Sequence, residues 1–418
     1  MHIVVVGLNH KTAPIEIREK LSFSEKRLQE PLKRLSVYSE IKGKVILSTC
    51  NRVEIYATTQ DFSRGVTEIK EFLSEYHGVP LADFEKYLYC YSTRETIKHI
   101  FRVSSSLDSM VIGEPQILGQ VKAAYFSAKE SNFAGPVLNR LFQKSFAVAK
   151  RIRNNTLIAT SAVSVSSVAV ELAKKILGGL KGKTVMLIGA GKMAELAANH
   201  LVSNGVKTLL ITNRTFEHAV ELAHKLNGTA IPFKNFTDQF LSTDIAISST
   251  EAPYFIVKKE GIIDITHARQ NKPMIFIDVA FPRDIEPSVN EIGNVHLYNI
   301  DDLGNVIKSN IKGREKEGQK AEKIISEEVL QFSHWLEIMP AISSLRKRAE
   351  KVRKQKMQKA LCHLSNISAK EKDTIDLLTS AIVNKILHVP ITNIKKETKS
   401  SNAHEHLKAF RRLFSLDE

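Results

Sequence analysis

Two short segments contain residues whose types and spacing suggest chemistry. The first, Gly189-Ala190-Gly191-Lys192-Met193-Ala194, is a G-x-G-x-x-A loop between an apolar run and a helical pattern. Small residues let the backbone turn tightly and approach a pyrophosphate, whose charge then lies against the N–H groups that begin the helix. Because a strand-like run precedes the loop and a helical pattern follows it, the segment predicts a dinucleotide-binding site.

The end of the next predicted strand indicates which dinucleotide binds. Asn213-Arg214-Thr215 stands about where NAD-binding proteins carry an acidic residue that accepts a hydrogen bond from the ribose 2′-hydroxyl. Residues 212–215 contain neither Asp nor Glu. An arginine at this point favours a 2′-phosphate and therefore NADP, and the alternative is a solvated arginine at the end of a strand.

The second segment surrounds Cys50. In Leu47-Ser48-Thr49-Cys50-Asn51-Arg52-Val53-Glu54, polar residues interrupt an extended apolar pattern. If 45–58 is one strand, alternate residues share a face, which groups Ser48, Cys50, Arg52 and Glu54. A guanidinium two residues away would stabilise a thiolate, the reactive form of cysteine. The residues leave two interpretations open, a nucleophile and a buried inert thiol.

Other candidate residues are less specific. Cys90 and Cys362 lack a polar setting, so we expect both to be structural. His99 lies beside the apolar residues of a predicted helix, where a histidine more often packs or faces solvent than takes part in catalysis. The 14 histidines show no metal-ligand spacing, which predicts that no metal is bound. The polar segment 108–116 is either a functional loop or a simple turn.

The elements that position these residues divide the chain into three predicted domains. Residues 1–158 mix short strands and helices, which indicates an α+β domain of ferredoxin-like type. Residues 159–300 contain five apolar runs of strand length, at 184–188, 208–212, 245–249, 274–279 and 295–298, which predict a Rossmann domain with a doubly wound parallel sheet. Residues 301–418 are predicted to be all-α, with apolar stripes that Pro340 is expected to break or kink.

Composition narrows the class of protein. The 418 residues include 60 Lys and Arg against 45 Asp and Glu, a net charge of +15 that favours a polyanionic partner such as nucleic acid, or merely aids solubility. Three cysteines cannot form a disulfide framework and favour a reducing cytosol. The N-terminal apolar run is too short for a signal peptide, and no stretch approaches the ~20 apolar residues of a membrane helix. We therefore expect a cytoplasmic protein without membrane association.

Three motifs together resemble the glutamyl-tRNA reductase family: Gly7–Pro14 (GLNHKTAP), Ser48–Glu54 (STCNRVE) and Gly113–Gln120 (GEPQILGQ). The glycine loop and Asn213-Arg214-Thr215 fit the same family. The likeness covers about the first 300 residues in the proper order, whereas the C-terminal part is similar only in length and helical character.

The resemblance implies an activity and a set of site residues. The reaction would be the NADPH-dependent reduction of glutamyl-tRNA to glutamate-1-semialdehyde through a cysteine thioester, the first step of 5-aminolevulinate and tetrapyrrole (porphyrin and haem) synthesis. Cys50 corresponds to the nucleophile, His99 to a position important for activity, and Gly189–Ala194 to the loop that holds NADPH. The glutamyl pocket would be lined by Thr49, Asn51, Arg52, Ser109, Glu114, Pro115, Gln116 and Gln120, with Arg52 gripping the substrate carboxylate.

The resemblance also implies an assembly. The chain would form a V-shaped homodimer, in which each protomer is strung on a long spinal helix and dimerises through its C-terminal helices. Glutamyl-tRNA would be the nucleic acid partner. A transient complex with glutamate-1-semialdehyde aminomutase is a further hypothesis.

Two alternative functions account for parts of the sequence. A shikimate-dehydrogenase-like NADP oxidoreductase would suit 184–215, but it gives Cys50 no role and leaves the net charge unexplained. A non-catalytic, nucleotide-regulated RNA-binding protein would explain the charge but not the cysteine segment. Nicotinamide oxidation with glutamyl-tRNA, with dehydroshikimate or with neither distinguishes the three.

Overall fold

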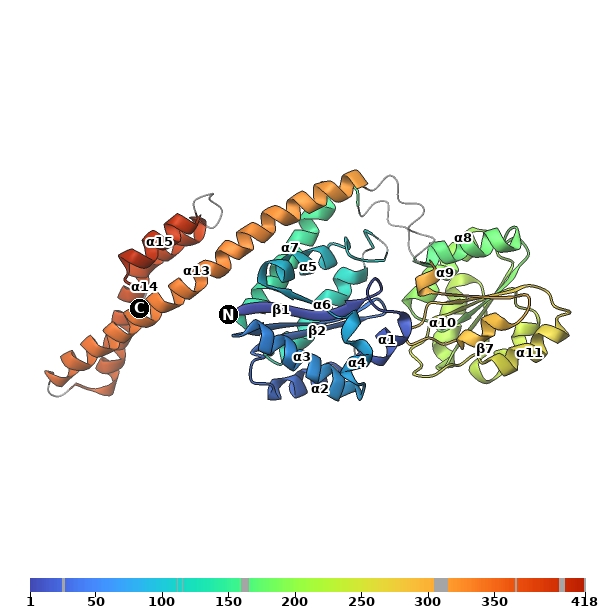
Figure 1. The fold of residues 1–418 in the computed structure, drawn as a ribbon, viewed down its shortest axis with the longest axis horizontal. Coiled ribbons are helices and arrows are strands. Elements are labelled where there is room, and N and C mark those ends of the chain that lie inside the picture. The colour runs from blue at the N-terminus through green and yellow to red at the C-terminus, as the bar shows by residue number, and fades with distance from the viewer. Residues whose placement is uncertain are drawn as a thin grey trace. The chain divides into compact units, whose positions relative to one another are not determined.

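The computed structural model describes residues 1–24, 27–110, 112–114, 116–158, 165–303, 315–364, 367–397 and 403–416. The chain separates into two compact units. One unit, 1–92 with 99–321, contains both β-sheets, and the other, 93–98 with 322–418, is helical. Figure 1 traces the elements of each unit along the chain.

The first sheet is four-stranded and antiparallel. Its strands are β1 (His2–Asn9), β2 (Gly43–Thr49), β3 (Arg52–Thr59) and β4 (Tyr89–Ser92), in the order β2-β3-β1-β4. Every residue of β2 and β3 is buried, because helices cover the sheet. The helices of this part are α1 (Ile15–Lys20), α2 (Gln29–Arg34), α3 (Phe62–His77), α4 (Leu81–Phe84), α5 (Thr93–Ser104), α6 (Gln116–Glu130) and α7 (Gly135–Asn155). The strand order confirms the ferredoxin-like prediction.

The extended run expected over 45–58 is a hairpin rather than one strand. The two strands β2 and β3 meet at a turn formed by Cys50 and Asn51, and their register pairs Thr49 with Arg52. The predicted grouping is therefore correct for Arg52 and Glu54, but Ser48 pairs with Val53 on the other face. The prediction failed there because alternation along the sequence does not distinguish one strand from two strands joined by a two-residue turn.

The second sheet is parallel and six-stranded. Its strands are β5 (Thr184–Ile188), β6 (Thr208–Asn213), β7 (Thr229–Pro232), β8 (Ile245–Ser248), β9 (Met274–Asp278) and β10 (Val295–Asn299), in the order β10-β9-β8-β5-β6-β7. This doubly wound order confirms the Rossmann prediction. The additional strand β7 escaped prediction because it is a short edge strand with exposed ends, and it closes on a proline.

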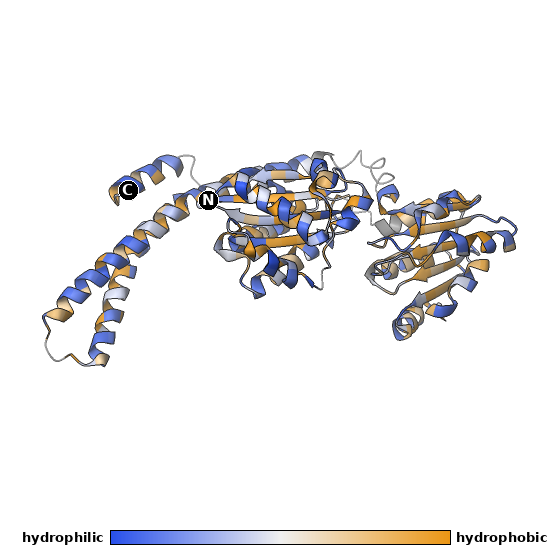
Figure 2. Cartoon of the chain, turned by 60° about the horizontal axis from the view of Figure 1, so that its bottom comes forward, coloured by the Kyte–Doolittle hydropathy of each residue, from blue (hydrophilic) through white to orange (hydrophobic). Residues whose placement is uncertain are grey.

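Helices cover both faces of this sheet and bury its apolar strands, which are orange in Figure 2. They are α8 (Val165–Leu177), α9 (Lys192–Ser203), α10 (Phe216–Leu226) and α11 (Lys259–Ala268). The strand order reverses between β5 and β8, and in such sheets ligands bind at the carboxyl ends of the strands beside that reversal. The fold thus brings the loops after β5, β6 and β8 to one edge.

The helical unit is built from α13 (Glu315–Cys362), α14 (Ala369–Lys396) and α15 (Ala403–Leu413). Its core joins Ile338, Ala341, Ile342 and Leu345 of α13 to apolar residues of the other two helices. Pro340 does not end the helix, so of the break or kink that the sequence predicts, the break is wrong. Buried neighbours on both sides of the proline pack against α14 and α15, and this packing keeps the turn helical.

One face of α14 is apolar and uncovered. Leu387, Ile391 and Ile394 are buried, whereas a second stripe is exposed and consists of Leu378, Ile382, Ile386 and Val389. By length and composition α14 is also a helix that could cross a membrane, which the sequence analysis did not anticipate. A single helix of this kind is weak evidence for a membrane span, because the core helix of a soluble protein passes the same test of length and composition.

Candidate active site

The hairpin turn presents Cys50. The Oγ1 atom of Thr49 accepts hydrogen bonds from the backbone N–H groups of Asn51 and Arg52, both at 3.2 Å. These bonds pin the turn, so the half-buried residue Cys50, which packs against an apolar cluster, is held by a rigid element rather than by a loose loop.

The Cys50 thiol is protonated in this environment. Burial, together with the nearby carboxylates of Glu114 and Asp301, raises its pKa to about 12, while the guanidinium of Arg18 acts in the opposite direction. Arg52, which lies two residues from the thiol in the sequence, is not among the largest causes of this shift. A thiolate therefore forms at Cys50 only when its proton is taken up by another group during the reaction.

Arg52 is fully buried and already has carboxylate partners. Its Nη1 lies 2.6 Å from Oε1 of Glu54 and 3.3 Å from Oδ2 of Asp108, while Nη2 donates to the Asp108 carbonyl. Lys11 also binds the Asp108 carboxylate. A substrate carboxylate would reach Arg52 by displacing Asp108, or at Nε, a buried atom without a partner among the described residues.

Glu54 links Arg52 to His99. Its side chain has no exposed surface, and it receives hydrogen bonds from the hydroxyls of Tyr56 and Tyr89, both at 2.5 Å, as well as from Arg52. Nε2 of His99 lies 2.7 Å from Oε1 of the same carboxylate. These donors hold the pKa of Glu54 well below its usual range, so the carboxylate is charged and His99 donates to it. Proton exchange with a substrate would then fall to Nδ1 of His99.

A group of buried polar atoms near this network has no hydrogen-bond partner among the described residues. Both ring nitrogens of His10 are buried without a partner among the described residues, as are Oδ1 of Asn51 and Oγ of Ser109. Burial and the charges of Arg52 and Lys11 lower the pKa of His10 to about 3, so its ring is neutral. Because buried polar atoms are nearly always hydrogen-bonded, such a group of unpaired atoms points to a substrate that supplies the missing partners.

Glu114 completes the surroundings of the thiol. Burial raises its carboxyl pKa to about 7, and its carbonyl accepts a hydrogen bond from Ser106. The preceding Gly113 has φ of +90°, and a Cβ there would lie 2.1 Å from the Ile158 carbonyl, so only glycine fits this turn. Pro115, predicted to line the pocket, lies outside the described residues.

The cofactor-binding prediction coincides with a cavity of about 1090 Å³ at the reversal point of the second sheet. Ala190, Gly191 and Met193 line it, together with Asn213, Arg214, Thr215 and the segment 249–254 after β8. Gly189 and Ala194 do not line it: Gly189 has φ of +104° against the Ser249 carbonyl, and Ala194 is buried in the core. The side chain of Lys192 lies outside the described residues.

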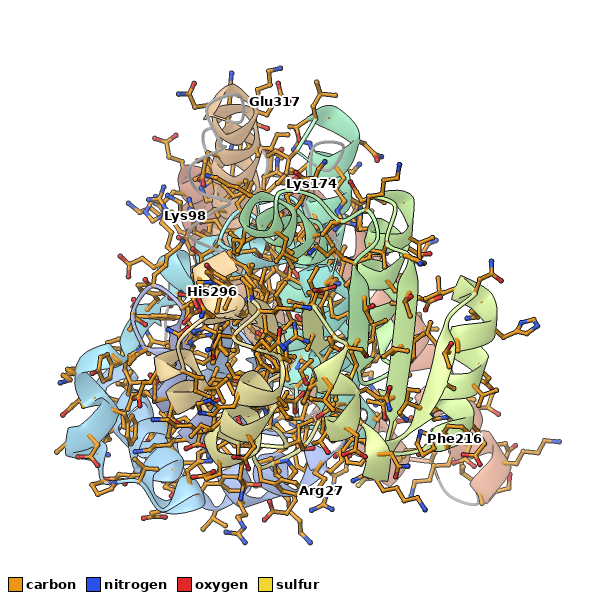
Figure 3. The ribbon with its side chains drawn as sticks, turned by 90° about the vertical axis from the view of Figure 1, so that its right-hand side faces the viewer. Arg27, Lys98, Lys174, Phe216, His296 and Glu317 are labelled. Atoms are coloured by element: carbon orange, nitrogen blue, oxygen red, sulfur yellow. The ribbon has the colours of Figure 1, made fainter. Side chains whose placement is uncertain are left out.

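Two predicted glutamyl-pocket residues, Gln116 and Gln120, also line this cavity, from helix α6. The Nε2 atom of Gln116 lies 3.0 Å from the sulfur of Met193 in the glycine loop. At the other end, Arg214 is exposed and precedes Phe216, the residue labelled at the start of α10 in Figure 3. The glycine turn, the cavity and the arginine fit an NADP molecule, whose nicotinamide would lie toward α6.

Sequence reasoning missed several residues of this site, namely His10, Lys11, Arg18 and Asp108, and it grouped Glu54 with Cys50 and Arg52 without giving it a role. The sequence offers little indication of their role, because each of them acts through a contact with a residue that is distant in the sequence. The motif Gly7–Pro14 contained two of them but offered no spacing that predicts a contact with Arg52. Among the described residues, no group of three or more His, Cys, Asp and Glu could hold a metal ion.

Comparisons with known proteins cover the whole chain. Residues 6–156 match the model of the glutamyl-tRNA(Glu) reductase N-terminal domain, 171–306 that of shikimate/quinate 5-dehydrogenase, and 320–416 that of the glutamyl-tRNA(Glu) reductase dimerisation domain. Glutamyl-tRNA reductases of Geotalea daltonii and Geobacter sulfurreducens are each 48% identical to the chain, covering 100% of it and 97% and 96% of their own lengths. The solved glutamyl-tRNA reductase of Methanopyrus kandleri is 32% identical over 100% of this chain and 99% of its own, with a TM-score of 0.47.

Proposed function

Because this chain belongs to the glutamyl-tRNA reductase family, we propose that it reduces glutamyl-tRNA to glutamate-1-semialdehyde with NADPH, the first step of 5-aminolevulinate and tetrapyrrole synthesis. The observation that carries this proposal is the turn that holds Cys50 beside buried, unpaired polar atoms. The alternatives fit less well, since the dehydrogenase model matches only 171–306 and leaves the Cys50 site without a task.

The first step forms a thioester. The sulfur of Cys50 attacks the ester carbonyl, the bond to the ribose oxygen breaks, and the released tRNA hydroxyl takes up the proton that the thiol gives away. Glu114 supports this transfer, because a carboxyl with a pKa of about 7 can accept and return a proton near neutral pH. A thioester carbonyl is more electrophilic than an oxygen ester, so two easier steps replace one difficult step.

The second step reduces the thioester. Bound NADPH would supply the hydride, and collapse of the resulting hemithioacetal releases the aldehyde and the thiol. Arg52 orients the glutamyl carboxylate, and His99, itself oriented by Glu54, positions the carbonyl or exchanges a proton at Nδ1. The remaining pocket residues are Thr49, Asn51, Ser109, Glu114, Pro115, Gln116 and Gln120.

The cofactor is held by the loop and the arginine. The N–H groups at the start of α9 would hold the pyrophosphate, because Gly189-Ala190-Gly191-Lys192-Met193-Ala194 leads into that helix. Asn213, Arg214 and Thr215 line the same cavity and would hold the adenosine 2′-phosphate, with which the guanidinium would pair.

The assembly follows from the same family. We propose domains at 1–158, 159–300 and 301–418, and a cytoplasmic homodimer formed through the last of them. The exposed apolar stripe of α14 supports a dimer, since such a stripe needs a partner surface. A transient complex with glutamate-1-semialdehyde aminomutase would pass on the reactive aldehyde.

A labelling experiment tests the chemistry. With glutamyl-tRNA carrying radiolabelled glutamate and no NADPH, label should attach to the peptide that contains Cys50. Cys50→Ser should abolish semialdehyde formation while NADPH and tRNA binding stay nearly intact, and Cys90→Ser and Cys362→Ser should stay active. If label never attaches and Cys50→Ser still produces semialdehyde, hydride attacks the ester directly. NADPH oxidation with dehydroshikimate instead of glutamyl-tRNA would support the dehydrogenase alternative.

A further inference from the structure

Arg18 is a fully buried arginine beside the nucleophile that the reaction scheme leaves unused. It belongs to the short helix α1 and has no exposed surface. Its guanidinium donates to the carbonyl of Cys50, to the carbonyl of Ala13 and to the carboxylate of Asp301. A buried charge is costly unless its hydrogen bonds are satisfied, and here they bind the nucleophile's own backbone.

Two carboxylates and one guanidinium are the charged groups with the largest effect on the Cys50 thiol. Among the largest electrostatic effects on this thiol, the carboxylates of Glu114 and Asp301 disfavour the thiolate and the guanidinium of Arg18 favours it. Arg52, which stands closer in sequence, is bound to Glu54 and Asp108 instead. The positive charge at the nucleophile therefore comes from α1.

We propose that Arg18 is a positioning residue for Cys50, fixing the carbonyl of the nucleophile and keeping a buried positive charge next to its thiol. This inference rests on the proposed role of Cys50 as nucleophile. A neutral donor would satisfy the carbonyl equally well, so the use of a buried guanidinium is explained by its charge.

Asp301 holds the other side of the guanidinium. It follows β10, the last strand of the parallel sheet, and its backbone N–H donates to Oδ1 of Asn299 at 2.8 Å. Arg18 therefore bridges the Cys50 turn and the segment that leaves the nucleotide-binding sheet. Because Asp301 fixes one end of the guanidinium, the other end stays on the Cys50 carbonyl.

The experiment measures alkylation of Cys50 by iodoacetamide in the full chain carrying Cys90→Ser and Cys362→Ser. At a fixed pH of 8 the rate is proportional to the thiolate fraction, and one unit of pKa changes it about tenfold. We expect Arg18→Gln to slow alkylation about tenfold or more, and Arg18→Lys, which keeps the charge, to stay within about threefold of the parent.

Arg283→Gln is the matched control. Arg283 binds Glu16 and Glu19 of the same helix, at 3.0 and 2.9 Å, but does not contact Cys50. Its loss should leave the alkylation rate unchanged, which separates the positioning of Cys50 from the anchoring of α1.

The direction in which the alkylation rate changes distinguishes the proposal from a merely structural role of Arg18. If Arg18 only supports packing, its loss exposes the thiol and alkylation speeds up or stays the same, and either result overturns the proposal. If Arg18→Gln does not fold, the Lys variant decides, and a tenfold slower rate in that folded protein contradicts a role for the charge. Failure of the thioester labelling described above would refute the reaction scheme but leave this alkylation result standing.

Discussion

At the scale of single residues, the candidate nucleophile Cys50 lies on the turn of a hairpin, and the charged groups around it come from distant segments. Cys50 and Arg52 were grouped because they alternate along an extended run, and the hairpin keeps both near the turn. Glu54 was placed on the same face as Arg52, yet its buried bonds to Tyr89 and His99 depend on β4 and α5, which no local pattern connects to β3. Contacts between distant segments are what single-sequence reasoning could not supply.

Cofactor choice depends on one arginine. We expect wild-type protein to prefer NADPH strongly over NADH, and Arg214→Asp to lose most of that preference, because a charge-assisted contact is replaced by repulsion. The ratio of kcat/KM for the two cofactors measures this, and a fall of about tenfold to a hundredfold corresponds to about 1.4–2.8 kcal/mol. Equal use of both cofactors by the wild type would contradict the assignment.

Asp278 makes stability depend on pH. Burial and the charge of Asp284 raise its carboxyl pKa to about 7 in the folded protein, above the ordinary value of 3.8. Between these pH values the folded state binds a proton that the unfolded state does not, so unfolding free energy falls as pH rises from about 4 to 7.

Asp278→Asn removes that titration. The difference in unfolding free energy between the variant and the wild type should shift by about 1–3 kcal/mol in favour of the variant when the pH is raised from 4.5 to 8. Thermal midpoints of both proteins at the two pH values measure this shift. Asp373→Asn, on the exposed surface of α14, is the control and should give the same difference from wild type at both pH values. A difference for Asp278→Asn that does not change with pH would show that Asp278 stays charged throughout.

At the scale of elements, the hydrophobic pattern of the sequence predicted the buried strands of the parallel sheet but not its partly exposed edge strand. Five of the six parallel strands were predicted because they are apolar runs, and β7 was missed because it is short and partly exposed. Pro340 was expected to interrupt α13, but tertiary packing of its neighbours overrides the local preference.

The turn between β5 and α9 requires glycine at one position only. Gly189→Ala should lower unfolding free energy by about 1–3 kcal/mol and weaken NADPH binding, because a Cβ there would lie 2.3 Å from the Ser249 carbonyl in a left-handed backbone conformation. Gly191→Ala meets nothing within 4 Å and should leave the thermal midpoint nearly unchanged. Equal midpoints for the two variants would mean that the loop rearranges.

At the scale of the whole molecule, α14 leaves apolar surface uncovered. Ile382 and Ile386 are 49% and 66% exposed and lie away from the buried face of the helix. Ile382→Glu with Ile386→Glu should yield monomers that still bind NADPH, because charges cannot be buried at an apolar dimer interface. Sedimentation measures the assembly, Asn384→Glu on another face of α14 is the control, and a doubly substituted protein that stays dimeric would place the interface elsewhere.

The protonated state of Cys50 also affects which cysteine of the protein is oxidised first. Peroxides oxidise thiolates, so a thiol whose pKa burial raises to about 12 reacts slowly with them, whereas Cys362 is exposed at the end of α13. Oxidative damage should therefore accumulate on the surface cysteine first, as sulfenic acid or a mixed disulfide. The burial that keeps the Cys50 thiol protonated therefore also protects it from oxidation.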